Sequence, residues 1–171
     1  MRYKTAPGPV ELVGLEALAA AHDALPLVPE DVDDCCARVV DRTAVPDREE
    51  AREWITLLQA LDLAEETPRG YRRVRAEVGD DSKTGAPDAL ADAFEATVFG
   101  VAELCEALTT AGPLTVDESF DRLRPAVPAW ERERHADWVA VWTGRVERLL
   151  AWCVAFGLAE CDGDRYRTAE Q

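Results

Sequence analysis

The chain has 171 residues, 47% of them hydrophobic, which excludes a disordered acidic tail and allows one ordinary core or two small ones. The longest apolar run, Leu149 to Leu158, is too short and too close to charged residues to span a bilayer. Glu11, Glu16 and Asp23 interrupt the alanine-rich region near the N-terminus, so no export signal is predicted and we expect a soluble, cytoplasmic protein with no membrane partner.

The charge balance is strongly acidic, with 34 Asp and Glu residues against 19 Lys and Arg residues and a net charge of -15. Only two of the basic residues are lysines, and the combination of acidity, scarce lysine and abundant alanine resembles the proteins of haloarchaea. At molar salt the Debye length falls to about 3 Å, so repulsion between the chain and a nucleic acid would be largely screened. The charge therefore does not exclude a nucleic-acid partner.

The first half of the chain predicts three helices followed by a hairpin. Apolar residues recur at helical spacing over 10–25, 30–41 and 47–62, and prolines or acidic helix starts separate these segments. Residues 63–74 then form two short extended runs around a turn with proline and glycine, which is the pattern of a β-hairpin. A hairpin directly after a third helix is a wing.

The second half predicts the same order of elements after a polar linker at 78–87. One buried helix is expected over 88–111, and a shorter one follows the acidic start at Asp117–Glu118. The last helix is expected over 138–156, before a second hairpin at 158–168.

The two halves are related by an internal repeat. At an offset of 95 residues the hairpins share five identities, in which Leu63, Ala64, Glu65, Tyr71 and Arg72 match Leu158, Ala159, Glu160, Tyr166 and Arg167. At an offset of 87, Pro26–Leu27 and Glu30–Asp31 match Pro113–Leu114 and Asp117–Glu118. The two offsets differ by eight residues, and we place these extra residues of the second half around 125–134. The repeat predicts two tandem winged-helix units, 1–77 and 88–171, in a mainly helical fold with short β-hairpin wings (α+β).

The segment from Trp54 to Val74 is similar to winged-helix transcription regulators, in which a Leu-x-x-Leu-Gly-Leu-like helix end precedes a charged hairpin with Tyr-Arg. The second copy matches better at one point, because Gly157 stands where the first has Asp62. The resemblance implies a regulator-like protein that binds double-stranded DNA. Tandem winged helices in chromosome-segregation accessory proteins and in trafficking complexes bind other proteins instead, so a protein-interaction module is the alternative.

Arginines of the first unit are the candidate nucleic-acid contacts. The densest basic cluster lies on and just after the first hairpin, where a wing can lay side chains along a phosphate backbone, and comprises Arg69, Arg72, Arg73 and Arg75. Arg48 and Arg52 lie one turn apart on the third helix, among several glutamates. The alternative is that these arginines pair with neighbouring surface acids. In the second copy, Arg145 and Arg148 are taken as the counterparts of the helix arginines.

Trp138 and Trp142 are one helical turn apart on the last helix and share a face. One interpretation is that they pack in the core of the second unit. The other is that they anchor a homodimer or another protein partner, because tryptophan is enriched at interface centres.

No catalytic residue, metal site or cofactor is predicted. Glu131 and His135 are four residues apart on a helix, but no third metal ligand is spaced nearby. The serines lack a nucleophile elbow, and the chain has neither a Gly-x-Gly-x-x-Gly motif nor a phosphate-binding loop. The sequence therefore predicts a non-enzymatic protein.

Overall fold

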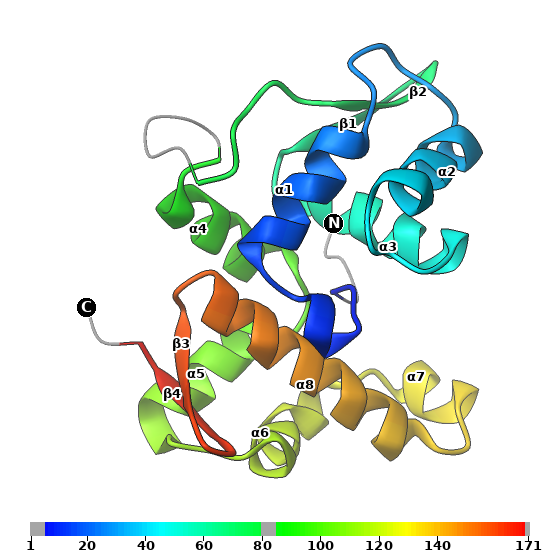
Figure 1. Cartoon of the computed structure of the whole chain (residues 1–171). Coiled ribbons are helices and arrows are strands. Elements are labelled where there is room, and N and C mark those ends of the chain that lie inside the picture. The colour runs from blue at the N-terminus through cyan, green and yellow to red at the C-terminus, as the bar shows by residue number, and fades with distance from the viewer. Residues whose placement is uncertain (1–5, 80–84, 170–171) are drawn as a thin grey trace.

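The computed structural model describes residues 6–79 and 85–169, which form two halves packed against each other (Figure 1). The first half has the order helix, helix, helix, hairpin: η1 (Val10–Leu12, a 3-10 helix), α1 (Leu15–Ala24), α2 (Val32–Arg42), α3 (Arg48–Ala60), β1 (Ala64–Thr67) and β2 (Gly70–Arg73). Residues 80–84 of the predicted linker lie outside the described residues. On either side of them, Gly79 N–H donates to the carbonyl oxygen of Gly85 at 2.7 Å.

The second half repeats this order and adds helices before and within it: α4 (Pro87–Thr97), α5 (Val101–Ala111), α6 (Val116–Leu123), η2 (Arg124–Ala126), α7 (Ala129–Arg134), α8 (Trp138–Ala155), β3 (Ala159–Asp162) and β4 (Arg165–Thr168). The helices α5, α6 and α8 take the places of α1, α2 and α3, and β3 and β4 form the second wing (Figure 1). The structure is thus mostly helical, with two tandem winged-helix units.

Capping side chains fix the starts of three helices, α2, α3 and α6. Asp31 and Asp47 each accept a hydrogen bond of 2.9 Å from the backbone N–H three residues further on, at the starts of α2 and α3. Thr115 caps α6 in the same way, and the side chain of Glu118 returns to the Thr115 N–H to complete a capping box. These bonds satisfy backbone donors that have no partner within a helix.

The prediction of a single helix over 88–111 is wrong, because the helix is interrupted between α4 and α5. Gly100 adopts φ +88°, a left-handed conformation that disfavours other residues, and precedes the first residue of α5. A Cβ at this position would approach the side chain of Leu123 to 3.2 Å. Apolar spacing continues across the break, so periodicity alone did not reveal it. Among the described residues of the first unit, the helix α4 has no counterpart.

The hairpins confirm the offset of 95 residues. In the first wing Glu65 is opposite Arg72, and in the second Glu160 is opposite Arg167. Each second strand also exchanges two backbone hydrogen bonds with the segment between the first two helices of its unit. Tyr71 bonds Glu30 at 2.7 and 3.0 Å, and Tyr166 bonds Leu114 at 2.7 and 2.8 Å.

These bridges correct the predicted alignment of the two units in the segments that precede the wings. Glu30 corresponds to Leu114, an offset of 84 residues, so the predicted match of Glu30–Asp31 with Asp117–Glu118 is wrong by three residues. Between Pro26 and Glu30, the residues Leu27–Pro29 have no counterpart in the second unit. The second unit instead has 11 additional residues between its bridge and its wing. They fall around η2 and α7, where an extra segment was predicted.

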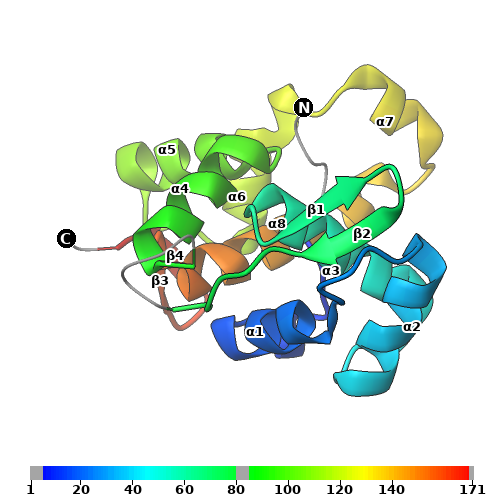
Figure 2. The same cartoon turned by 90° about the horizontal axis from the view of Figure 1, so that it is seen from above.

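The two units pack against each other (Figures 1 and 2). They share one continuous core, in which side chains of their third helices meet. The indole rings of Trp54 on α3 and Trp152 on α8 form an edge-to-face contact with centroids 5.4 Å apart. Trp152 Nε1 donates to the carbonyl oxygen of Pro7 at 2.9 Å, and Thr97 Oγ1 donates to that of Ala60 at 3.3 Å. The N-terminal segment and α4 therefore both contribute hydrogen bonds between the units.

Candidate functional site

The arginines of the first wing divide into two that are paired and two that are not. Arg72 forms an ion pair with Glu65 directly across the hairpin. Arg73 Nη1 lies 3.6 Å from a carboxylate oxygen of Asp23 and donates to its carbonyl oxygen at 3.3 Å. Arg69 and Arg75 are exposed and form no ion pair with any residue in 6–79 or 85–169. Of these four arginines, Arg69 and Arg75 thus keep the whole guanidinium free of ion pairs within the described ranges.

The second wing repeats the cross-strand pair. Arg167 lies 3.0 Å from Glu160, in the register that Arg72 and Glu65 occupy in the first wing. Both pairs are about half exposed. An interaction that recurs at the same register in both wings belongs to the hairpin itself, because cross-strand pairs of opposite charge stabilise antiparallel strands. Arg72 is therefore explained without a nucleic acid.

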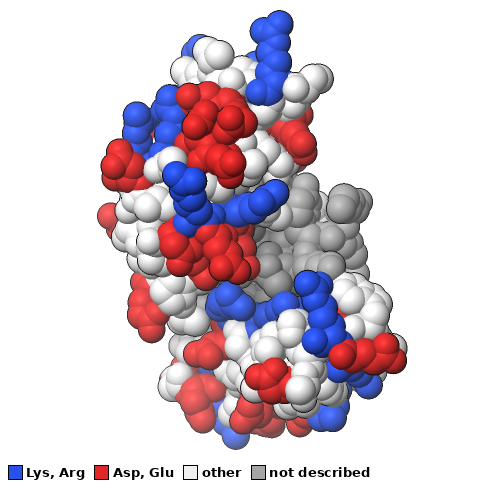
Figure 3. Space-filling view, turned by 90° about the vertical axis from the view of Figure 1, so that its right-hand side faces the viewer, with Lys and Arg blue, Asp and Glu red and all other residues white. Residues whose placement is uncertain are grey.

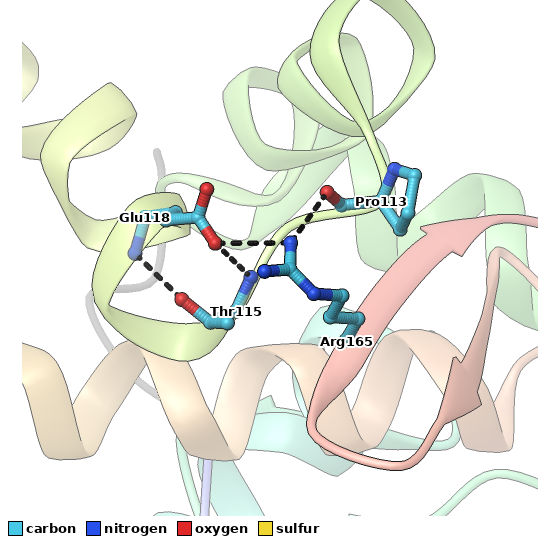
Figure 4. A network of polar contacts seen from close by, with 4 residues as sticks. All are labelled: Pro113, Thr115, Glu118 and Arg165. Carbon is cyan, nitrogen blue, oxygen red and sulfur yellow. Dashed lines mark hydrogen bonds and ion pairs between the residues drawn. The ribbon is translucent and has the colours of Figure 1, made fainter.

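Arg165 ties the second wing to the start of α6 (Figure 4). Its Nη1 lies 3.2 Å from Glu118 Oε1 and 3.5 Å from the carbonyl oxygen of Pro113. The pKa of Glu118 is lowered, first by hydrogen bonds from the backbone and side chain of Thr115 and further by Arg165. The arginine at the turn of this wing therefore serves the fold.

The third helix of the first unit carries both signs of charge on its outer side. Arg48 and Arg52 are exposed and form no ion pair within the described ranges. Between them, Glu49 is exposed, whereas Glu50 and Glu53 are half-buried. Burial raises the pKa of Glu53, Glu50 raises it further, and the attraction of Arg148 on α8 only partly opposes this. The glutamates thus face the second unit.

The predicted correspondence between Arg48 and Arg52 and the arginines of the last helix is wrong. At the offset of 95, Arg145 and Arg148 correspond to Glu50 and Glu53, and the two third helices carry opposite charges at equivalent positions. Arg145 pairs with the buried carboxylate of Glu131 on α7 at 3.2 Å. The charged sides of α3 and α8 are therefore shaped by contacts within the chain.

The surface over the predicted recognition helix is mixed in charge. Figure 3 views the side of the molecule that carries α2, α3 and α7, and there arginines and carboxylates alternate over the described residues. A winged helix that reads DNA inserts its third helix into the major groove, where carboxylates facing phosphates are unfavourable. On this side the described residues form no continuous basic face (Figure 3).

The two tryptophans considered as an interface pack inside the second unit. Trp142 is 2% exposed, its ring contacts Phe99 edge to face at 5.6 Å, and Arg145 lies 4.8 Å from its centroid. Trp138 is half-buried against Phe120. These contacts favour the core interpretation for Trp142, because a side chain so buried offers a partner almost no surface. Trp138 also stacks with arginines from η2 and α7, Arg124 and Arg132.

Sequence reasoning missed an outward bulge between α1 and α2. Arg73 N–H donates to the carbonyl oxygen of Pro26 at 2.7 Å, and Tyr71 exchanges its two bonds with Glu30. The strand residues are two apart, whereas their partners are four apart, so Leu27–Pro29 is pushed away from the strand. Leu27 and Val28 are left exposed. The signal available in the sequence was an apolar dipeptide between two prolines, which periodicity treated only as a helix break.

The described residues offer neither a membrane span nor a metal centre. No helix in 6–79 or 85–169 combines the length and the apolar character needed to cross a bilayer. Over the same ranges, no three His, Cys, Asp or Glu side chains come close enough to hold an ion together.

The Cys35 thiol is a poor nucleophile, because burial raises its pKa to about 11.

Comparison with known proteins gives one result. The model of one protein family, described as the halobacterial double winged helix domain, matches residues 1–171. Neither a curated protein nor a solved structure matches the chain.

Proposed function

Since the chain belongs to the halobacterial double winged helix family, we propose that it is a non-enzymatic protein-binding module rather than a reader of DNA sequence. The observation that carries this proposal is the contact between the two third helices, α3 and α8, through Trp54 and Trp152. The elements that would enter the major groove are partly used to join the units. The wings and the segments inserted between the repeated elements remain outside this contact.

The charges support the same function. Each wing neutralises one arginine with a cross-strand glutamate, and on α3 the exposed Glu49 adds a negative charge beside Arg48 and Arg52. On an acidic surface adapted to high salt, binding to another protein depends more on apolar contact than on long-range attraction, because the salt screens charge.

A capture experiment at multimolar potassium chloride tests the proposal. The full chain is immobilised, captured proteins are identified by mass spectrometry, and the candidate is purified and titrated by calorimetry. We expect saturable binding by a defined partner. A chain that is strictly monomeric by light scattering and binds no purified candidate would contradict the proposal. A concentration-dependent homodimer would make a second copy the partner.

Binding of double-stranded DNA is the second candidate, and a specific observation favours it. Arg48, Arg52, Arg69 and Arg75 belong to the first unit, are exposed and have no ion-pair partner among the described residues. They could contact phosphates along the third helix and the wing. We would measure duplex binding by fluorescence anisotropy at multimolar potassium chloride. If this function holds, Arg69→Ala with Arg75→Ala weakens binding strongly, whereas the paired Arg72→Ala has a smaller effect. Absence of binding by the unaltered chain excludes it under those conditions.

A further inference from the structure

The segment Leu27–Pro29 is not needed to build a winged-helix unit. The second unit forms the same bridge to its wing without any counterpart of these residues. In the first unit the segment forms the bulge at the top of Figure 1, beside β2. Val28 is 75% exposed and Leu27 is 41% exposed, and Val28 is the most exposed large apolar side chain among the described residues. Adjacent exposed apolar side chains are typical of a surface that another molecule covers.

Arginines surround the bulge. Three hollows of about 360 to 410 Å³ border Leu27. They are lined by five arginines and four carboxylates: Arg38, Arg42, Arg72, Arg73 and Arg75, with Asp23, Glu30, Glu65 and Glu77. Three of the arginines are paired, to Glu30, Glu65 and Asp23. The charges lining the hollows therefore sum to one positive, in a chain whose net charge is -15.

Two of these arginines remain available to a ligand. Arg42 and Arg75 are exposed and make no ion pair with the residues that the structure describes. Arg42 shares one hollow with Leu27 and Val28, and Arg75 lines the other two. Leu27 thus borders hollows lined by Arg42 and by Arg75, two arginines without an ion pair among the described residues. We call Leu27, Val28, Arg42 and Arg75 the bulge surface.

We propose that the bulge surface binds an acidic polypeptide segment that carries a large apolar side chain. This inference rests on the protein-binding function proposed above and names the kind of partner. The apolar side chain of the partner would cover Val28 and enter a hollow beside Leu27, while its carboxylates would pair with Arg42 and Arg75. Charge complementarity sets the choice of partner, and apolar contact supplies most of the affinity at high salt.

A DNA duplex fits the bulge surface less well. Phosphates could pair with Arg42 and Arg75, but the backbone of a duplex offers nothing apolar to cover Val28. A second copy of the chain would have to bring an acidic apolar segment to the bulge. Each of these alternatives gives a different result in the experiment below.

The experiment uses a fluorescent probe peptide with two leucines flanked on both sides by glutamates, titrated with the full chain at multimolar potassium chloride. We expect Leu27→Ser with Val28→Ser to weaken binding by roughly tenfold or more, from the apolar area left uncovered. Val139→Ser is the matched control, because Val139 is also 41% exposed but lies on α8, and it should leave binding unchanged. Arg42→Gln with Arg75→Gln should also weaken binding, whereas Arg122→Gln on α6 should not.

Several results would overturn the inference. They are no binding of the probe peptide, equal binding of a probe with serines in place of its leucines, and a duplex whose binding needs Arg42 and Arg75 but not Val28. Dimerisation that Val28→Ser abolishes would assign the surface to a second copy. If a captured partner still binds the Leu27→Ser, Val28→Ser chain, this inference fails while the protein-binding function stands. If the chain binds neither a partner nor the probe, both fail.

Discussion

The two winged-helix units differ most where they meet each other and where they meet solvent. Both keep the hairpin register, the bridge to the first interhelical segment and the glutamate–arginine pair across the wing. Their third helices have diverged in charge, with Glu50 and Glu53 on α3 at the positions of Arg145 and Arg148 on α8. The contacts that build each unit are repeated, whereas the charges on the third helices differ between the units.

The insertions follow the same division. The second unit has gained η2 and α7, which are held in place by the ion pair between Glu131 and Arg145 and by arginines stacked on Trp138. Between its first two helices, the first unit has the additional segment Leu27–Pro29, which has large apolar side chains on the surface. The insertion in the second unit adds helices that pack on the fold, whereas the insertion in the first unit adds exposed side chains without a new helix or strand. This contrast is why the first unit is assigned the partner-binding role.

The largest expected effect is at the contact between the units. Trp152→Ala should destabilise the chain by about 3–5 kcal/mol, because the indole is fully buried and its Nε1 bonds Pro7. A double-mutant cycle with Trp54→Ala should give a coupling of about 0.5–1.5 kcal/mol from the edge-to-face contact. Denaturant unfolding at high salt measures both. Two separate transitions in the unaltered chain would contradict the view that the units share one core.

The next largest effect on stability should distinguish the turn of the first wing from that of the second. Gly70 has φ +122°, and a Cβ there would lie 2.0 Å from the carbonyl oxygen of Glu30. Gly70→Ala should therefore cost about 1–3 kcal/mol, because both the backbone conformation and the bridge to Glu30 are disturbed. Arg165→Ala at the equivalent position should cost only about 0.2–1 kcal/mol, because it removes a half-exposed ion pair with Glu118. Equal effects in thermal unfolding would mean that the bridge does not constrain the first wing.

A smaller, pH-dependent effect tests the diverged third helices. Burial raises the pKa of Glu53 above 4.5, so its ionised form is less favourable in the folded chain than in the unfolded one. Stability from this group is therefore lost as pH rises through the folded pKa. Glu53→Gln should stabilise the chain at neutral pH, and its advantage should vanish as the pH falls to 4.5 and below. The exposed Glu49→Gln is the control, and stabilisation by it to the same degree would point to a general effect of net charge.

The architecture was predictable from the sequence because its signals are local. Helical periodicity followed by a glycine-containing turn identified both wings, and the shared Tyr-Arg placed them in register. The break at Gly100 was missed, because apolar residues continue across it in phase and a lone glycine is tolerated within a helix.

The surfaces were less predictable, because they depend on contacts distant in the sequence. Nothing local distinguishes the wing arginine Arg72, which pairs across the hairpin, from Arg69, which does not. The outward push on Leu27–Pro29 follows from where β2 binds the chain on either side of it. The sequence alignment of the two units was wrong by three residues before the wings, so it did not show Leu27–Pro29 as an insertion. That alignment rested on matching dipeptides, whereas the correct register follows from the backbone bridges to the wings, which only the structure provides.

The smallest effect compares the wings directly. The pair of Glu65 with Arg72 and the pair of Glu160 with Arg167 have the same register and nearly the same exposure, so double-mutant cycles should give equal couplings of about 0.2–1 kcal/mol. Raising the salt concentration should reduce both together, because half-exposed charges are screened. A coupling present only in the second wing would release Arg72 for a ligand and strengthen the case for DNA binding. Equal couplings would make Arg72 a structural residue and leave Arg69 and Arg75 as the wing arginines available for recognition.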